Sequence, residues 1–412
     1  MAAPILKLPV EILLIIFARL LPRDLQAVCL TYRGWNSLAQ PFLYDHIEWT
    51  WTRSQIPPII QFLRSIVHRP ELARFVHSLT LKGVDLDDEH TGGTRKKHPH
   101  IPVTEIDLDG LVECIETLHV PYAQQWIQEL RAGVMDALVT LLLSRLPGLR
   151  VLYMGKNFTR EARLTGMMLR SALCDQSENS NLPSFKHLQD VEAVHGGLDI
   201  YRRREADYRD RDDNLALFYL PSIERIRVQI DNPTIFMWPG QSPPNPSRLT
   251  SLDLTLLRES HLGQVLSVTR GLQKLNWDWY YREDIRDRVF RDIIDLDQIA
   301  ADLSHVQDTL TDLTITAGSD PYQSAPYPPE LAFRGSFRTF SGLHMLQKLE
   351  VPIPFLFGFS PEAPSTLNLI LSVWASCKLC QRVGLHRRGF IHDPGPLVFS
   401  EEITPPEVLY IF

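Results

Sequence analysis

The chain has 412 residues, of which 44% are hydrophobic and 22% charged, and its net charge is -7. These are the proportions of an ordinary globular protein, and the negative charge argues against the one-sided basic field of a general nucleic-acid binder. The longest apolar run near the start, residues 12–18, is far shorter than the ~20 residues that cross a bilayer, and no signal-peptide pattern is seen. Five scattered cysteines indicate free thiols in a reducing compartment, so we expect a cytoplasmic or nuclear protein that does not enter a membrane.

The first forty residues predict three short helices, the first of which opens at Leu8-Pro9. Proline is favoured at the first helical position, because its missing N–H would have no partner there. Apolar residues then recur at helical spacing, at Ile12, Leu13, Ile16, Phe17 and Leu20. Leu14 and Ile15 extend the apolar surface beyond one stripe, so this helix needs two surfaces to pack against. In so short a module, the second surface can belong to another chain.

Two further helices are expected before residue 41. Pro22 is predicted to end the first helix, and Asp24 to cap a second helix that starts at Leu25. Gly34 marks the next break, and a third apolar set precedes Pro41. This third set consists of Trp35, Leu38 and Ala39. Three helices in some forty residues form only a marginal core, so the module needs support from the rest of the chain or from a partner.

In order and spacing, these residues resemble the F-box. The resemblance is carried by Leu8-Pro9-Val10-Glu11-Ile12, Ile16-Phe17-Ala18-Arg19-Leu20, Asp24-Leu25 and Arg33-Gly34-Trp35-Asn36-Ser37-Leu38-Ala39. Pro41-Phe42-Leu43-Tyr44 follows, as in fungal F-box proteins, whereas Thr31-Tyr32 departs from the Val-Cys that the family often has. The resemblance implies that the module docks on a Skp-type adaptor, which bridges to a cullin scaffold, by burying apolar helix residues. The contact residues so implied are Leu8, Pro9, Ile12, Leu13, Ile16, Phe17, Leu20, Leu25, Trp35 and Leu38.

The remainder of the chain repeats the pattern apolar-x-x-apolar-x-apolar. Its copies begin at Val76, Leu149, Leu188, Ile223, Leu249, Leu272, Leu310, Leu346 and Cys380. The second and third apolar residues alternate as in a short strand with one buried face. Helices are predicted between the strands, over residues 134–146, 287–303 and 367–375. One strand and one helix or loop per copy resembles a divergent leucine-rich repeat, in which the strand-capping asparagine is present once, at Asn157.

The predicted fold is therefore α/β, with a three-helix F-box over residues 1–48 followed by an irregular leucine-rich-repeat solenoid over residues 49–412. Loop insertions rich in charge or proline are expected near residues 84–103, 202–214, 239–247 and 319–330. The alternative for the second part is a set of unrelated hydrophobic strands in an α/β domain.

Little in the sequence suggests catalysis. Cys377 and Cys380 have metal-ligand spacing, and His386 and His392 follow within reach. Cys380, however, occupies an apolar position of the repeat, so we interpret the pair as buried thiols. The motifs of hydrolase nucleophile elbows, phosphate-binding loops and zinc-protease helices do not occur in the sequence. We therefore expect no enzyme activity, no metal and no cofactor.

The strands of a leucine-rich array line one face, from which the residues between the buried positions point outward. The candidate substrate-binding residues chosen on this basis are Tyr153, Arg225, Arg227, Asp253, Asn276, Trp279, Lys348 and Arg382. Such a mixture of charges and aromatics favours a protein partner over a nucleic acid. The sequence thus predicts a non-catalytic substrate-recognition subunit of a Skp/cullin/F-box ubiquitin ligase. The alternative is a leucine-rich-repeat scaffold that acts independently of ubiquitination.

Overall fold

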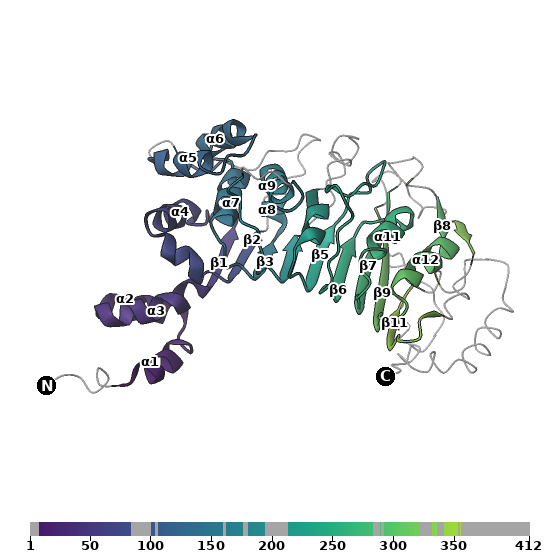
Figure 1. Ribbon diagram of the computed structural model, residues 1–412, viewed down its shortest axis with the longest axis horizontal. Coiled ribbons are helices and arrows are strands. Elements are labelled where there is room, and N and C mark those ends of the chain that lie inside the picture. Colours follow the sequence, from purple (N-terminus) through teal and green to yellow (C-terminus); the bar gives the residue numbers. More distant parts are fainter. Residues whose placement is uncertain are drawn as a thin grey trace, which may run out of the picture. The chain divides into compact units, whose positions relative to one another are not determined.

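The protein is described by a computed structural model with two compact units (Figure 1). Unit 1 comprises Met1–Leu198, Tyr219–Ile223 and Pro239–Gln241, and unit 2 comprises Asp199–Phe218, Glu224–Trp238 and Ser242–Phe412. The residues that the structure describes are 8–83, 100–103, 106–159, 162–175, 180–193, 213–282, 289, 292–320, 332–335, 342–352 and 355.

Unit 1 begins with the three predicted helices, α1 (Val10–Phe17), α2 (Pro22–Thr31) and α3 (Arg33–Asp45). Their bounds differ from the expected ones. Pro22 begins α2 instead of ending α1, because proline suits the first turn of a helix. Asp24 consequently lies inside the first turn of α2, where its charge complements the helix dipole, and is not the cap. α3 continues through Pro41.

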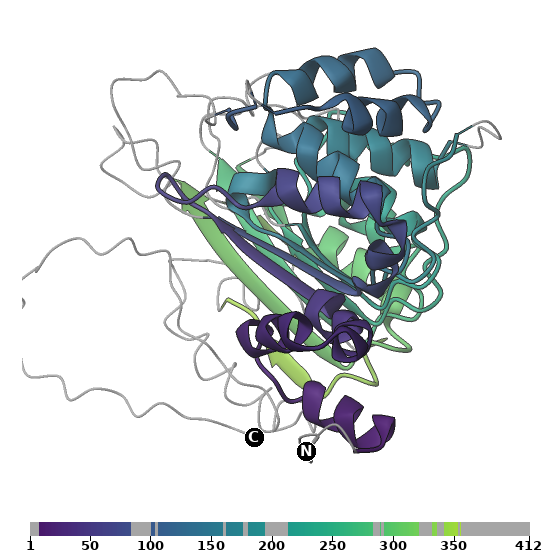
Figure 2. The same cartoon turned by 90° about the vertical axis from the view of Figure 1, so that its left-hand side faces the viewer.

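A parallel sheet follows directly, in the order β1 (His46–Trp51), β2 (Ser78–Gly83), β3 (Val151–Met154) and β4 (Asp190–Ala193). The helices that follow α3 in this unit lie to one side of these strands (Figure 2). They are α4 (Ile59–His68), the 3-10 helix η2 (Pro70–Phe75), α5 (Asp109–Glu116), α6 (Ala123–Arg131), α7 (Met135–Ser144), α8 (Lys156–Thr159) and α9 (Arg163–Leu173).

Unit 2 contains a second run of parallel strands, in the order β5 (Arg225–Gln229), β6 (Ser251–Thr255), β7 (Lys274–Arg282), β9 (Asp312–Asp320) and β11 (Lys348–Glu350). A small pair, β8 (Ile293–Asp295) and β10 (Ala332–Arg334), lies apart from them. The helices of this part are η4 (Asp213–Tyr219), α11 (Glu259–Leu266), α12 (Leu296–Leu303) and η5 (Ser304–Val306). Among the described residues, none of the helices has the length and apolar character needed to cross a membrane.

The repeat pattern forms strands wherever the structure describes it. Eight of the nine predicted copies are confirmed, as β2 to β7, β9 and β11, and the copy at Cys380 lies outside the described residues. The second apolar residues of neighbouring copies pair in register within each unit. In unit 1 the pairs run Leu79–Leu152–Val191, and in unit 2 Ile226–Leu252–Leu275–Leu313–Leu349. Successive copies therefore stack the same apolar position in one buried layer.

The sequence analysis missed β1. This strand starts at His46, immediately after α3, and pairs Ile47 with Leu79. Tyr44-x-x-Ile47-x-Trp49 has the repeat pattern, but it overlaps the end of the F-box motif and was not recognised as a copy. The first strand thus begins inside the segment that we assigned to the F-box.

The helix predictions between the strands had mixed outcomes. The helix expected over 134–146 is confirmed as α7. The helix expected over 287–303 is wrong in part, because residues 293–295 form β8 and the helix starts only at Leu296. Two adjacent β-branched residues, Ile293 and Ile294, favour the strand there. The helix expected over 367–375 lies outside the described residues.

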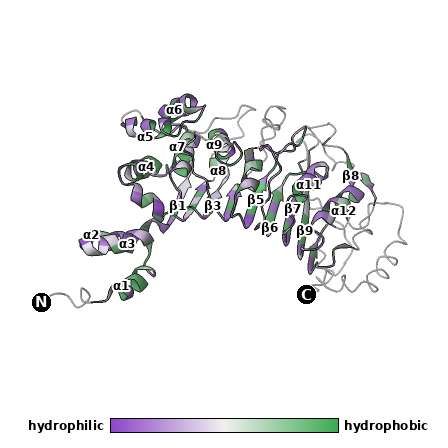
Figure 3. Ribbon diagram, in the orientation of Figure 1, coloured by the Kyte–Doolittle hydropathy of each residue, from purple (hydrophilic) through white to green (hydrophobic). Residues whose placement is uncertain are grey.

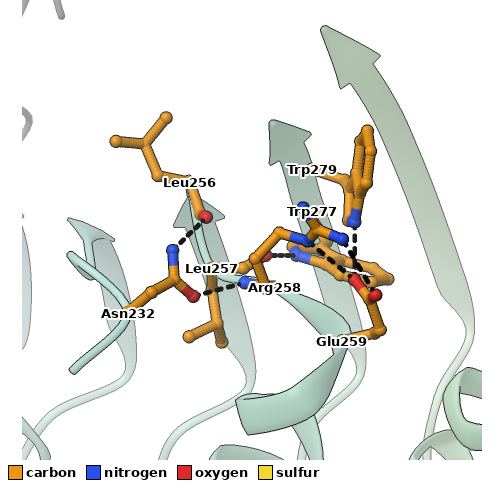
Figure 4. A network of polar contacts seen from close by, with 7 residues as sticks. All are labelled: Asn232, Leu256, Leu257, Arg258, Glu259, Trp277 and Trp279. Carbon is orange, nitrogen blue, oxygen red and sulfur yellow. Dashed lines mark hydrogen bonds and ion pairs between the residues drawn. The ribbon is translucent and has the colours of Figure 1, made fainter. Parts of the chain in front are cut away.

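A buried polar network joins the ends of three strands in unit 2 (Figure 4). The side chain of Asn232, which follows β5, donates to the Leu256 carbonyl (2.8 Å) and accepts from the Arg258 N–H (2.7 Å). Arg258 is fully buried and makes two 3.0 Å hydrogen bonds to the Glu259 carboxylate. Trp279 donates to the same carboxylate, and the Arg258 guanidinium lies 4.5 Å from its ring centroid. The buried charges are thus paired, as burial requires.

The expectation that a strand-capping asparagine occurs only once is therefore wrong. Asn157, which follows β3 in unit 1, donates to the Trp51 carbonyl at the end of β1 (2.7 Å), and Asn232, which follows β5 in unit 2, donates to the Leu256 carbonyl just after β6 (2.8 Å). Asn157 lies three residues after the last apolar residue of its repeat copy, Met154, whereas Asn232 lies four residues after Val228. That one-residue shift hides the second asparagine from a search at fixed spacing.

Replacing Asn232 by alanine should lower the free energy of unfolding by about 2–3 kcal/mol, because two buried backbone groups lose their partner. The φ of 43° at this residue adds to the cost, since asparagine tolerates the left-handed region better than alanine does. Urea denaturation measures the change. Asn276→Ala, on an exposed position of β7, should cost well under half as much; equal losses would contradict a capping role.

Helices α11 and α12 pack closely where Gly263 meets Asp302. A Cβ atom at Gly263 would collide with the Asp302 carboxylate, so only glycine fits there. Asp302 is buried, and its Oδ1 accepts a hydrogen bond from Gln298 (2.7 Å). Burial raises the pKa of Asp302 from its ordinary value of 3.8 to about 6. The fold therefore favours the protonated carboxyl group.

This raised pKa predicts how stability depends on pH. Asp302 binds its proton more tightly in the folded chain, so the free energy of unfolding should fall as pH rises from about 4 to above 6, by up to about 3 kcal/mol. Asp302→Asn should flatten that decline in urea denaturation at pH 5 and pH 8. Asp308→Asn, an exposed carboxyl in the same unit, should leave the decline unchanged, and equal curves for all three proteins would contradict the assignment.

Candidate functional site

Helix α1 uses one side to close the core of the N-terminal helices. Leu13 and Phe17, one helical turn apart, are buried together with Leu25 of α2 and Ala39 of α3. The Phe17 ring meets the edge of Trp35 with 6.3 Å between ring centroids. Partly buried residues complete this core, namely Leu20, Val28, Cys29, Trp35, Leu38, Phe42 and Leu43. The core thus consists of residues from these three helices and the segment between α1 and α2.

Several large apolar residues in α1 and just before it are exposed, and Ile12, Ile15 and Ile16 among them lie on the side away from the core. Val10, Ile12, Ile15 and Ile16 are exposed by 48%, 42%, 62% and 37%, and Leu8 precedes them. We call these five residues the α1 apolar face; the hydrophobic character of α1 is visible in Figure 3. Further large apolar side chains are exposed around α2, at Leu21, Leu30 and Tyr32. Contiguous exposed apolar side chains of this kind mark an interaction surface.

The structure divides the predicted adaptor-contact residues into three groups. Leu8, Pro9, Ile12 and Ile16 are exposed, and Leu20, Trp35 and Leu38 are half-buried against the core. Leu13, Phe17 and Leu25 are buried, so their side chains shape the module and are not available to a partner. Their selection as contact residues is corrected accordingly. The sequence analysis omitted Val10 and Ile15 from the set, although Ile12, Ile15 and Ile16 have the spacing of one helical face.

Hydrogen bonds fix α2 and α3 to the residues just before η2 and β2. Asn36 donates to the Cys29 carbonyl (3.0 Å), Gln40 donates to Asn36 (2.6 Å), and Arg69 donates to Gln40 (3.2 Å). They run from α2 through α3 to the residue before η2. At the junction of α3 and β1, His77 contacts the Asp45 carboxylate through its side chain (2.7 Å) and the Asp45 carbonyl through its backbone N–H (3.0 Å). No flexible linker separates α3 from β1.

The predicted substrate-binding residues fall on the outward positions of the strands, with one exception. Arg225, Arg227, Asn276 and Lys348 are exposed in unit 2, and Tyr153 is half-buried on β3 of unit 1. Asp253 occupies an outward position of β6 but is buried. Trp279 is fully buried and packs on Arg258, so its selection was wrong. β7 extends past Asp278, and the two-residue period of a strand places Trp279 on the same side as buried Trp277. Arg382 lies outside the described residues.

Three of these residues are brought together by strand pairing. Arg227, Asp253 and Asn276 are register neighbours on β5, β6 and β7. Arg227 donates to the Asp253 carboxylate (2.7 Å), and Asn276 donates to its other oxygen. The Asp253 carboxylate is thus held from both sides. We call the outward positions of β5, β6, β7, β9 and β11 the unit 2 strand face.

The described residues contain no group of three or more His, Cys, Asp or Glu side chains that could hold a metal ion. Cys29, Cys114 and Cys174 are free thiols. Burial raises the pKa of Cys174 to about 11, which keeps it protonated and unreactive. Cys377 and Cys380 lie outside the described residues.

These features define the N-terminal helices as a small docking module with its own core and an exposed apolar helix face. Comparison with known families agrees: residues 5–48 match the F-box-like family. The match spans α1, α2, α3 and the start of β1, and F-box domains generally bind Skp-type adaptors. The chain therefore carries an F-box-like domain at its N-terminal end. No curated protein matches the chain.

The two sides of α1 should respond differently to truncation. Phe17→Ala should remove about 3 kcal/mol from the local stability of the F-box-like domain, because it leaves a cavity in the core. Ile15→Ala should change that stability by less than about 0.5 kcal/mol, since the side chain is exposed. Amide hydrogen exchange of α1 to α3 measures both changes, and similar losses of protection would contradict the division of the helix into two faces.

Proposed function

We propose that this protein is the substrate-recognition subunit of a Skp/cullin/F-box ubiquitin ligase. The observation that carries the proposal is α1, which completes a core with Leu13 and Phe17 while Val10, Ile12, Ile15 and Ile16 stay exposed, with Leu8 exposed just before it. An adaptor with a complementary apolar groove would bury the exposed side, in the manner of helix-in-groove recognition. The match of residues 5–48 to the F-box-like family supports a Skp-type adaptor as that partner.

The stacked strands support the second half of the proposal, a leucine-rich-repeat array that binds a protein substrate. Eight copies of one pattern form parallel strands, and within each unit they pair position for position. Their outward residues form rows of polar and charged side chains suited to protein recognition. The hydrogen bonds from α2 to Arg69 hold the docking module against the first of these strands and helices.

In this role the chain positions a substrate lysine for chemistry that occurs on other subunits, so it needs no catalytic residue of its own. The chain would function in the cytoplasm or the nucleus, where the adaptor and cullin scaffold act. The second candidate function is a protein-interaction scaffold without a role in ubiquitination. It is favoured by the rows of exposed charges in unit 2, which can bind a partner whether or not an adaptor is present.

Adaptor binding should depend on the exposed side of α1 and not on its buried side. The double variant Ile12→Glu with Ile15→Glu should lose co-elution with a purified Skp-type adaptor while keeping the melting temperature of the wild type. Both positions are exposed, and substitutions at exposed sites usually change the free energy of unfolding by no more than about 0.5 kcal/mol. Charges at these positions would have to be desolvated in an apolar groove.

Ile235→Glu is the matched control, because Ile235 is as exposed as Ile15 but lies in unit 2. It should bind the adaptor like the wild type. Failure of the folded wild-type protein to bind any Skp-type adaptor would overturn the ligase proposal and leave the scaffold function.

A further inference from the structure

The unit 2 strand face presents its charges unequally. Strand pairing aligns two rows of outward residues across β5, β6, β7, β9 and β11. The first row is Arg225, Ser251, Lys274, Asp312 and Lys348, and the second is Arg227, Asp253, Asn276, Thr314 and Glu350. Asp278 and Thr316 follow in the next row. All four cations in these rows are exposed, whereas all four carboxylates are buried or half-buried.

The carboxylates are recessed because they are bonded within the face. Asp253 accepts from Arg227 and Asn276, and Asp278 accepts from Thr316 at 2.8 Å. The Asp312 carboxylate accepts a hydrogen bond from the Thr311 hydroxyl (2.6 Å). The Glu350 carboxylate forms an ion pair with the Lys348 ammonium group (3.8 Å). The formal charges balance, but the side chains that a partner meets first are the cations. The face is therefore complementary to a negatively charged ligand.

We propose that the unit 2 strand face binds an acidic segment of a protein, with carboxylates seated over Arg225 and Lys274. This inference rests on the proposed function, in which the strand face is the substrate site, and it names the class of substrate. Arg225 and Lys274 are two strands apart with Ser251 between them, a separation of about 10 Å at the usual strand spacing. An extended segment in the polyproline II conformation returns a side chain to the same side every three residues, about 9.3 Å along its axis. Acidic residues three apart would match the two cations.

A protein segment suits this face better than a nucleic acid. The four cations of these rows are interrupted by recessed carboxylates, so they can pair with spaced acidic residues but not with each charge of a continuous phosphate backbone. Trp279, which could have offered a stacking surface for bases, is fully buried. The strand face of unit 1 has the opposite bias, with Glu48, Asp190 and Glu192 on outward positions against Lys82. The acidic ligand is thus specific to the strands of unit 2.

The test uses the full-length chain in the presence of a Skp-type adaptor, and two fluorescent peptides of twelve residues. One has glutamate at every third position with serine and proline between, and the other has lysine at the same positions. Fluorescence anisotropy should show binding of the glutamate peptide that weakens as salt rises, and no comparable binding of the lysine peptide. Arg225→Glu with Lys274→Glu should weaken binding of the glutamate peptide at least about tenfold.

Arg131→Glu is the matched control, since Arg131 is an exposed cation on helix α6 of unit 1 and should leave peptide binding unchanged. The neutral double variant Arg225→Gln with Lys274→Gln should show an intermediate loss of peptide binding. It is a second control, because it removes the two positive charges without the charge reversal that could disturb folding.

Failure of the wild-type chain to bind the glutamate peptide while it binds the adaptor would overturn this inference alone. Loss of adaptor binding with peptide binding retained would overturn the ligase role alone. Tighter binding of a single-stranded RNA of equal charge would also overturn the choice of a protein ligand.

Discussion

The in-register pairing of apolar residues between parallel strands is the constraint on which the rest of the structure depends. In unit 2, Ile226, Leu252, Leu275 and Leu313 form one buried layer across four strands, and half-buried Leu349 continues it on a fifth. A slip of one residue in any strand would turn its apolar side chains outward and its charged ones inward. Burial therefore fixes the register, and the register in turn aligns the outward residues. Arg225, Ser251 and Lys274 form a row because the apolar residues that follow them, Ile226, Leu252 and Leu275, form a layer.

Helix α1 is under a second constraint, because a short module has too few residues to bury all its apolar surface. Leu13 and Phe17 are enough to close the small core with α2 and α3. The remaining apolar residues of the helix stay in solvent and give it the capacity to bind a partner. The module does not stand alone, because Asn36, Gln40 and Arg69 tie it to the residues around the first two strands. The same three helices thus provide a small core, an exposed docking face and the hydrogen bonds that attach the module to the rest of unit 1.

Polar residues at the ends of the strands supply hydrogen bonds that the apolar layers cannot. Asn157 and Asn232 each donate to a carbonyl where a strand ends, one in each unit. In unit 2 the network extends to Arg258 and Glu259, a buried ion pair that also contacts Trp279. Breaking one partner of such a pair leaves a buried charge, which costs more than the pair contributes. These groups therefore fix how the chain leaves each strand more than they add to its stability.

Elements whose signal is local could be predicted from the sequence. Helical spacing predicted the three N-terminal helices and α7, and the repeated apolar pattern predicted the eight strands, because residues close in the chain create both periods. Which side of an element is buried, and where its contacts lie, depends on how the elements pack together. Phe17 and Ile15 are equally apolar, but Phe17 is buried because Trp35 and Leu25 cover it. Trp279 is buried because β7 continues past Asp278 and brings it against Arg258, a residue from another part of the chain. Contacts between residues distant in sequence depend on the packing of whole elements, which no local pattern specifies.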